Sequence, residues 1–323
     1  MIGIHKVSVK NSRNSYTFKL TRNITVLCGD SGRGKTTLYE MIHEYNRYGR
    51  NSGVSISCDK KLVTLEGEDW NYVLSKINNA IVVIDEDSKF IRSDDFARAV
   101  RGSDNYYLLI TRNYLPNLPY SVDEIFEISG EKNKKFRPIY KGTKRIYDHI
   151  SSRKLPFLPE IIITEDSKSG YEFFKNEAVR MGIICVSAEG KSNIYSRIKK
   201  YRDKNVVVIA DGAAFGAEIR SIVEQQTLSP NKIVIFLPES FEWLILKSGA
   251  VGGIEIEKID SPQLYADSTD YMSWEQYFTS LLEDATRDID YKRYSKTHLA
   301  EFYLQDRTAE KIKQQIEGIR FNI

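Results

Sequence analysis

One glycine-rich segment near the N-terminus has the composition and spacing of a loop that binds phosphate groups. Residues 29–36 read GDSGRGKT and match the pattern GxxxxGK[ST]. Glycines in such a loop let backbone N–H groups turn toward an anion, and the start of the following helix adds its positive dipole end. We expect Lys35 to reach the β- and γ-phosphates of ATP and Thr36 to bind Mg²⁺. The predicted nucleotide-binding residues of this loop are Gly29, Asp30, Ser31, Gly32, Arg33, Gly34, Lys35, Thr36 and Thr37.

Two acidic residues follow an apolar segment, residues 81–84, in a pattern that resembles a Walker B segment. We expect Asp85 to hold the Mg²⁺ through water and Glu86 to polarise the attacking water, as a catalytic residue beside Lys35. The alternative is that the two acids cap the next helix. The following predicted strand ends in Thr111, Arg112 and Asn113. Asn113 or Thr111 is expected to face the γ-phosphate if that strand lies beside the Walker B strand, and otherwise to cap a loop.

The distance between the two motifs limits the kind of ATPase. About fifty residues separate Lys35 from Asp85, which is too short for the helical subdomain of an ABC-type ATPase, and no LSGGQ-like segment lies between them. We therefore expect a reduced P-loop ATPase, whose arginine finger has to come from another subunit or a partner. Position alone makes Arg92, Arg98 and Arg101 candidates for that residue.

A second set of acidic residues follows two apolar strands in the C-terminal half. Residues 161–164 precede Glu165 and Asp166, and residues 206–210 precede Asp211. The carboxyl ends of parallel strands lie at one edge of a sheet, where ligands usually bind. Carboxylates gathered there repel each other unless a divalent cation lies between them, and such a cation can activate water or hold a phosphodiester.

The C-terminal half resembles a TOPRIM domain, as found in overcoming-lysogenization-defect nucleases and related P-loop-plus-TOPRIM defence proteins. The matching residues are Glu165, the loop 187–193 (SAEGKSN), the segment 211–216 (DGAAFG) and the segment 238–242 (PESFE). The resemblance implies that Glu165 and Asp211 are catalytic, metal-binding acids, with Glu239 or Glu242 as a further ligand. It also implies a Mg²⁺-dependent nuclease with a role in anti-phage defence.

One departure from the family pattern leaves other interpretations open. The family has DxDxxG where this chain has Ala213 in place of the second acid. The domain therefore either keeps one metal ion, recruits Asp166 or Glu242, or is a degenerate scaffold that binds a partner without catalysis. A receiver-like domain with Glu165, Asp166 and Asp211 as its acids and Lys258 as its later lysine is the strongest other fold.

Strands that alternate with helices are needed to position these residues, and both halves show this pattern. The fold class is predicted to be α/β: a P-loop NTPase domain with a parallel sheet over residues 1–148, then a TOPRIM-like domain with C-terminal helices over residues 149–323. Strands are predicted at residues 24–28, 53–58, 61–66 (the last two as a possible hairpin), 80–84, 106–110, 123–128 (at an edge), 160–164, 182–186, 205–210 and 232–237. Helices are predicted at residues 35–47, 69–77, 94–101, 169–181, 192–201 and 215–226, and for most of 274–319.

The composition of the 323 residues is that of a globular protein, with 41% hydrophobic and 28% charged residues. The 47 Lys and Arg residues nearly balance the 44 Asp and Glu residues, which excludes a histone-like polycation. Cys28, Cys58 and Cys185 are too far apart for a CxxC metal site or a disulfide framework. No segment resembles a secretory signal or a membrane-spanning helix of roughly 20 residues, so we expect a cytoplasmic protein without a membrane partner.

Two local basic stretches and one apolar stripe indicate partners. Residues 130–145 and 191–204 are rich in Lys and Arg with interspersed aromatic residues, which is typical of DNA or RNA contact but also of solvated surfaces. Ile312, Ile316 and Ile319 recur at helical spacing. They predict a helix that covers the C-terminal sheet or, alternatively, a surface for a homo-oligomer or a partner protein.

Overall fold

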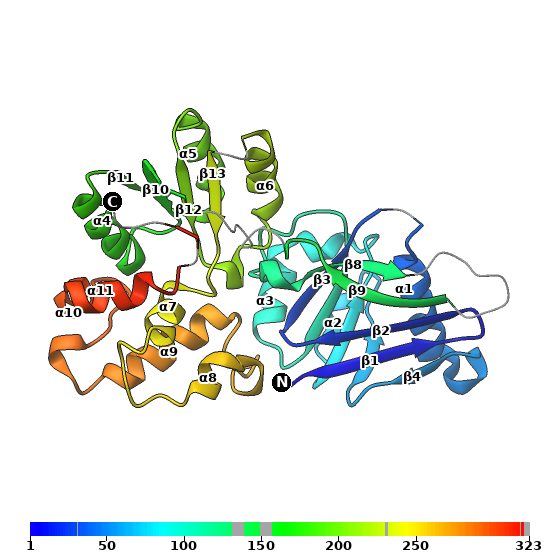
Figure 1. Ribbon diagram of the computed structural model, residues 1–323. Coiled ribbons are helices and arrows are strands. Elements are labelled where there is room, and N and C mark those ends of the chain that lie inside the picture. Colours follow the sequence, from blue (N-terminus) through cyan, green and yellow to red (C-terminus); the bar gives the residue numbers. More distant parts are fainter. Residues whose placement is uncertain (31, 131–138, 149–156, 230–231, 317, 320–323) are drawn as a thin grey trace. The chain divides into compact units, whose positions relative to one another are not determined.

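The computed structural model describes residues 1–323 except 31, 131–138, 149–156, 230–231, 317 and 320–323. The chain forms two compact units of α/β structure (Figure 1). The first unit comprises Met1–Tyr147 together with Gln263–Ser273, and the second comprises Asp148–Pro262 together with Trp274–Ile323. Each unit is built around its own sheet.

The first unit contains a nine-stranded sheet in which most neighbours are parallel. Its strand order is β4 (Ser55–Ser57), β1 (His5–Lys10), β2 (Asn14–Leu20), β9 (Ile139–Arg145), β8 (Ile125–Gly130), β3 (Ile24–Cys28), β7 (Tyr106–Ile110), β6 (Ala80–Ile84) and β5 (Lys61–Thr64). The run from β8 to β5 is parallel throughout. Strand β9 pairs antiparallel with β8 and parallel with β2, and β1 pairs antiparallel with β2 and β4.

The centre of this sheet is apolar because it is covered on both faces. Strands β6 and β7 are buried along their whole length, as continuous apolar runs in parallel sheets are. Helix α1 (Lys35–Tyr48) buries Leu38, Met41 and Ile42, which lie on one helical face. Two shorter helices, α2 (Trp70–Leu74) and α3 (Asp94–Arg101), follow, and the Ser93 side chain caps α3 by accepting a hydrogen bond from the Phe96 N–H.

The structure confirms the central strands and the first helix and corrects three other predictions. Strands β4 and β5 do not form a hairpin, because β4 pairs with β1 and β5 with β6, at the two ends of the sheet. Strand β8 is not at an edge, because β3 and β9 pair with its two sides. Residues 139–145 of the first basic stretch form β9 within the sheet. The N-terminal strands β1 and β2 are additional elements that the sequence analysis did not predict.

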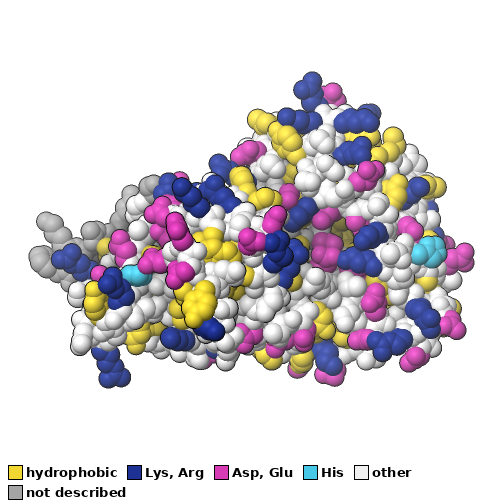
Figure 2. All heavy atoms as spheres, turned by 180° about the vertical axis from the view of Figure 1, so that it is seen from behind, with side chains coloured by type: hydrophobic (Ala, Val, Ile, Leu, Met, Phe, Trp, Pro, Cys, Tyr) yellow, Lys and Arg dark blue, Asp and Glu magenta, His cyan; other side chains and the backbone are white. Residues whose placement is uncertain are grey.

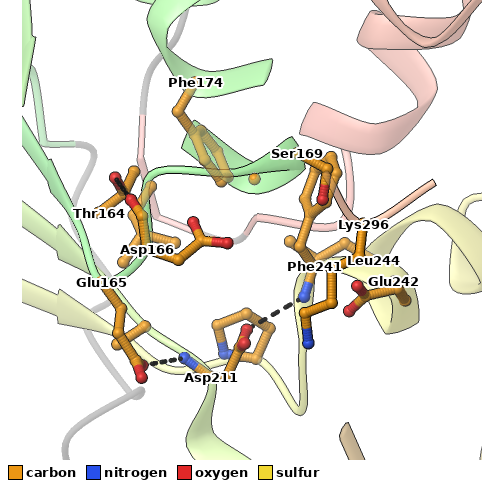
Figure 3. A pocket seen from close by; sticks show the side chains of 14 residues that line it. Thr164, Glu165, Asp166, Ser169, Phe174, Asp211, Phe241, Glu242, Leu244 and Lys296 are labelled. Carbon is orange, nitrogen blue, oxygen red and sulfur yellow. Dashed lines mark hydrogen bonds between the residues drawn. The ribbon is translucent and has the colours of Figure 1, made fainter. Parts of the chain in front are cut away.

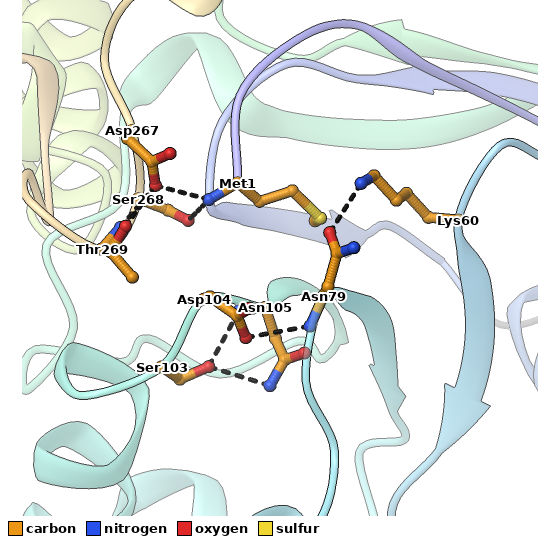
Figure 4. Close-up of polar contacts among 9 residues, drawn as sticks. All are labelled: Met1, Lys60, Asn79, Ser103, Asp104, Asn105, Asp267, Ser268 and Thr269. Carbon is orange, nitrogen blue, oxygen red and sulfur yellow. Dashed lines mark hydrogen bonds and ion pairs between the residues drawn. The ribbon is translucent and has the colours of Figure 1, made fainter.

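A segment from late in the chain is bound to the first unit by its polar contacts (Figure 4). The Met1 amino group donates hydrogen bonds to Asp267 Oδ1 at 2.6 Å and to Ser268 Oγ at 2.7 Å. On another part of the same unit, the Asn79 N–H donates to Asp104 Oδ1 at 2.9 Å. These bonds fix turns and ends that the apolar pattern of the sequence does not specify.

The second unit has a four-stranded parallel sheet in the order β11 (Ile184–Ser187), β10 (Ile161–Thr164), β12 (Val206–Ile209) and β13 (Ile233–Phe236). This confirms the four predicted strands. The helices are α4 (Ser169–Met181), α5 (Ile194–Lys200), α6 (Ile219–Leu228), α7 (Phe241–Lys247), α8 (Ile256–Asp260), α9 (Trp274–Thr286), α10 (Glu301–Leu304) and α11 (Asp306–Lys313). Ile312, Ile316 and Ile319 are buried, as predicted. The predicted helix is shorter than expected, because α11 ends at Lys313 and only Ile312 is helical.

A buried ion pair joins two helices of the second unit. Glu177 of α4 is 1% exposed, and its Oε2 lies 2.8 Å from Nζ of Lys313 in α11, which is 10% exposed. Lys313 also pairs with Glu310 at 3.0 Å, and Glu177 also pairs with Arg180 at 3.1 Å, so the two residues belong to a small network of charges. The pair therefore connects α11 to α4.

We predict that Glu177→Ala lowers the free energy of unfolding of the full chain by more than about 1 kcal/mol, because Lys313 keeps its partner Glu310 but loses the more deeply buried of its two carboxylate partners. The control is Glu224→Ala, which removes an exposed pair with Arg220 at 3.1 Å and should cost less than about 1 kcal/mol. Urea denaturation measures both. Equal losses in the two variants would show that the buried pair does not hold the helices together.

Candidate functional site

The loop between β3 and α1 has a backbone that only glycine adopts readily. Gly29, Gly32 and Gly34 have φ values of 108°, 78° and 97°, all in the left-handed region. Gly34 is also the residue that precedes the first helical turn of α1. The start of a helix after such turns presents backbone N–H groups, as an anion-binding loop requires. Ser31, which we predicted to bind nucleotide, lies outside the described residues.

Lys35 is a buried cation at the start of α1, with 5% of its surface exposed. Its Nζ donates hydrogen bonds to the carbonyl oxygens of Gly29 at 2.6 Å and Asp30 at 2.9 Å. Burial lowers the pKa of Lys35, and the nearby positive charge of Arg112 lowers it further. Among the described residues no carboxylate forms an ion pair with this ammonium group. A cation held in this way is ready to receive an anionic ligand.

A second lysine contacts the same loop from strand β9. Lys141 is the register partner of Tyr16 in β2, and its Nζ lies 3.2 Å from the Tyr16 hydroxyl and 3.3 Å from the Arg33 carbonyl oxygen. The Tyr16 hydroxyl donates to the Gly34 carbonyl oxygen at 2.9 Å. A Cβ on Gly34 would collide with the Lys141 ammonium group and would lie 2.7 Å from the Tyr16 hydroxyl. The positive φ favours glycine at position 34, and any other residue there would also displace the end of the Lys141 side chain.

Asp85 is placed at the carboxyl end of β6, beside a cavity. Its Oδ1 is buried and has no hydrogen-bond partner among the described residues. Burial raises the pKa of Asp85, and the neighbouring Asp87 and Glu86 raise it further. The cavity has a volume of about 590 Å³, and Tyr39, Trp70 and Asp85 are among its lining residues. Asp85 and the exposed Thr36 carry oxygen atoms of the kind that Mg²⁺ prefers, and their joint binding of Mg²⁺ stays a prediction.

Strand β7 lies between β3 and β6 in the sheet. Residues 111–113, which follow β7, therefore lie between the glycine-rich loop after β3 and the acids after β6. The Thr111 Oγ1 accepts a hydrogen bond from the Asn113 N–H at 3.0 Å, so this hydroxyl stabilises the turn. Arg112 Nε lies 3.3 Å from Glu86 Oε2. Strand β7 is thus adjacent to β6, the strand before Asp85, as the interpretation of Asn113 requires. The contact between Asn113 and the γ-phosphate stays a prediction. The sequence analysis did not single out Arg112 or Lys141.

In the second unit, two acids are joined through the backbone of adjacent strands (Figure 3). The Glu165 carboxylate accepts a hydrogen bond from the Asp211 N–H at 3.1 Å, and the Asp211 carboxylate accepts one from the Phe241 N–H at 3.2 Å. Burial raises the pKa of Glu165 to about 7, and it also raises that of Asp211, with Glu275 adding to both shifts. The two predicted catalytic acids therefore lie together at the carboxyl edge of β10 and β12.

Two further groups line the same pocket. Glu242 is 2% exposed, and its Oε1 accepts a hydrogen bond from the Tyr294 hydroxyl at 2.6 Å. Lys296 forms an ion pair with Glu275. Burial alone would lower the pKa of Lys296, but the carboxylates of Glu275, Glu242 and Asp211 together raise it. Figure 3 shows Asp166 and Asp211 facing the pocket, with Glu242 and Lys296 at its other side.

The pocket is small and oxygen-rich, with a cavity of about 30 Å³, enough for one water-sized species. Its carboxylates are the donors that Mg²⁺ prefers. However, no group of three or more His, Cys, Asp or Glu side chains in the described part of the chain is arranged to hold a metal ion. Ala213 is buried, and its N–H donates to the Glu239 carbonyl oxygen at 3.2 Å. Glu242, rather than Glu239, lines the pocket.

Some lysines of the basic stretches contact other groups of the same chain, which reduces their availability for nucleic acid. Lys199 lies 4.4 Å from the ring centroid of Tyr195, so one face of this ring is covered by a cation. Lys191 donates to the Ala214 carbonyl oxygen at 3.0 Å. Half of the first stretch, residues 131–138, lies outside the described residues. Figure 2 shows basic and acidic side chains interspersed on the face in view.

Comparisons with known proteins do not assign this chain to a family. No protein-family model matches the sequence, and no curated protein matches it. Within the described ranges, no helix has both the length and the apolar character needed to cross a membrane. The functional interpretation therefore depends on the geometry of the two sites.

We predict that Glu165→Gln changes how stability depends on pH. In the folded protein Glu165 keeps its proton up to about pH 7, whereas in the unfolded chain it loses the proton near pH 4.5, so this residue makes stability fall as pH rises between those values. The slope due to one such group is at most about 1.4 kcal/mol per pH unit. Glu165→Gln should flatten the profile in this window.

Denaturant unfolding of the full chain at several pH values, without added metal, measures this effect. The matched control is Glu224→Gln, which alters a glutamate that is 62% exposed and should leave the profile unchanged. A Glu165→Gln profile as steep as that of the wild type would contradict the burial of this carboxylate.

Proposed function

We propose that the first unit binds ATP and hydrolyses it. The observation that carries this proposal is the buried ammonium group of Lys35, whose hydrogen bonds within the described residues go to carbonyl oxygens of a loop with left-handed glycines. The triphosphate of ATP would supply an anionic partner for this cation. The loop N–H groups and Lys35 would bind the phosphates, and Lys141 would add positive charge at the same loop.

The residues around the loop can carry out hydrolysis of the γ-phosphate. Thr36 and Asp85 would hold Mg²⁺, which neutralises negative charge on the phosphates when bound. Glu86 would accept a proton from a water molecule whose oxygen forms a bond to the γ-phosphorus. The bond from that phosphorus to the β–γ bridging oxygen breaks, and ADP and phosphate leave, with the proton passing from Glu86 to the products.

Lys35→Ala should weaken ATP binding by at least about 100-fold, because it removes the charge that faces the β- and γ-phosphates. Isothermal titration of the full chain measures the affinity, and a melting curve verifies that the variant is folded. Lys19→Ala, an exposed lysine on β2, is the matched control and should bind like the wild type. Equal affinity of Lys35→Ala and wild type would contradict the proposed nucleotide site.

For the second unit we propose a Mg²⁺-dependent site that cuts nucleic acid, with ATP controlling its activity. The support is that Glu165, Asp211 and Glu242 line one pocket at the carboxyl edge of the sheet, where the resemblance to TOPRIM nucleases places metal-binding acids. Because the described side chains are not arranged around a metal ion, binding of Mg²⁺ would require these carboxylates to move together. Proteins with this pairing of domains act in anti-phage defence, which is the biological role we propose here. The basic residues of α5 and the preceding loop would contact DNA or RNA.

Two observations favour a second candidate function, in which this unit binds a partner without catalysis. Ala213 stands where the family has an acid, and Lys296 supplies a positive charge among the carboxylates. A lysine in that place can balance the negative charge that a metal ion would otherwise neutralise. The protein would then be a nucleotide-sensing adaptor.

A cleavage assay with Mg²⁺ or Mn²⁺, with and without ATP, separates these two functions. We predict that wild type cuts DNA or RNA and that Asp211→Ala lowers the rate by at least about 100-fold, because a metal-binding carboxylate is lost. Asp203→Ala, an exposed acid of the same unit, is the control and should cut normally. No cleavage by wild type in any condition would favour the adaptor, and full activity of Asp211→Ala would place the chemistry elsewhere.

A further inference from the structure

Arg112 is held beside the proposed hydrolytic site by the order of the strands. It follows β7, which pairs with the phosphate-loop strand β3 on one side and with the Walker B strand β6 on the other. Its Nε lies 3.3 Å from Glu86 Oε2. The Arg112 side chain is 49% exposed and that of Glu86 is 28% exposed. Both groups are therefore in contact with solvent and free to exchange partners.

The sheet brings a second cation to the same edge as Arg112. Lys35 follows the loop after β3, and Arg112 follows β7, which pairs with β3. The Glu86 carboxylate, which follows β6 on the other side of β7, is the ion-pair partner of Arg112. An anion that entered between Lys35 and Arg112 would relieve their repulsion and would compete with Glu86 for the guanidinium group.

The geometry points to Arg112 as a catalytic residue supplied by the chain itself, and to its ion pair with Glu86 as the resting state of the ATPase. The inference builds on the proposed ATP hydrolysis. When ATP binds, the γ-phosphate oxygens take the Arg112 guanidinium from Glu86. Arg112 then stabilises the charge on the transferring phosphoryl group, and Glu86 is released to accept the proton of the attacking water.

Physical chemistry favours this exchange for ATP and not for ADP. An exposed ion pair between single charges is weak, because water solvates both partners. The terminal phosphate carries more charge and offers several oxygens, and a planar guanidinium group binds such oxygens in a bidentate manner. ADP has no γ-phosphate, so the Arg112–Glu86 pair persists in its presence. The pair is thus a device that makes the general base available only when the substrate is complete.

With this assignment, the chain itself supplies the arginine finger as Arg112. The sequence analysis expected it from another subunit or a partner, with Arg98 among the candidates. Arg98 instead forms an ion pair with Asp95 within α3, and its side chain is 70% exposed. Arg112 is the arginine that contacts the proposed general base. Hydrolysis at a normal rate therefore does not depend on an arginine from a second molecule.

Single-turnover ATP hydrolysis and nucleotide binding by the full chain test this role. Arg112→Ala should slow hydrolysis by about 100-fold or more and weaken a non-hydrolysable ATP analogue about 10-fold, but change ADP binding less than about 3-fold. Arg112→Lys keeps the charge without the planar fork and should retain part of the activity. Arg98→Ala is the control and should behave as wild type.

A double-mutant cycle tests the resting ion pair itself. Glu86→Gln removes the competitor for Arg112, so it should tighten binding of the ATP analogue several-fold when Arg112 is present and have no effect in the Arg112→Ala background. ADP affinity should not change in either case. Independent effects of the two substitutions would show that the pair does not control nucleotide binding.

The outcomes distinguish this inference from the proposal on which it rests. Unchanged ATP binding in Lys35→Ala would remove the nucleotide site altogether. If wild type binds and hydrolyses ATP but Arg112→Ala does so equally well, only the role of Arg112 is overturned. Equal weakening of ADP and the ATP analogue in Arg112→Ala would also overturn it, because a γ-phosphate contact cannot affect ADP.

Discussion

The desolvated ammonium group of Lys35 is the feature on which the first unit depends. It is enclosed at the start of α1, and its described hydrogen bonds go to the carbonyl oxygens of the preceding loop. Burial disfavours the charged form, so the site gains most when an anion arrives. The parallel strands around it bring Glu86, Asp85 and Arg112 to the same edge of the sheet, where we propose that each has a different role toward the phosphates of ATP.

The sequence alone predicts the parts of this site that are local in the chain. The strand before the loop, helix α1, and the strands before Asp85 and Thr111 are all confirmed, because each is a short apolar or amphipathic segment with clear limits. Strand pairing is non-local, and there the predictions fail. Nothing in the spacing of residues 53–66 shows that β4 and β5 belong to opposite ends of the sheet.

Lys141 and Lys296 could not be identified from the sequence for the same reason, because their contacts are non-local. Lys141 belongs to a basic stretch that resembles a surface, but β9 enters the sheet beside Tyr16 and carries its ammonium group to the loop. Lys296 lies 85 residues from Asp211 in sequence, yet both line one pocket. Contacts of this kind depend on how distant segments pack, which composition and periodicity do not specify. In the acidic pocket, Ala213 and Lys296 act in the same direction, since each reduces the negative charge available to a metal ion.

We propose that the triphosphate of ATP binds at the loop of residues 29–36 and that its γ-phosphate takes Arg112 away from Glu86. The most direct measurement is a crystal structure of the full chain with Mg²⁺ and a non-hydrolysable ATP analogue. We predict that the β- and γ-phosphates contact Lys35 and the loop N–H groups, and that the Arg112 guanidinium contacts the γ-phosphate rather than Glu86. A nucleotide bound elsewhere, or phosphates in the loop with the Arg112–Glu86 ion pair still intact, would contradict it.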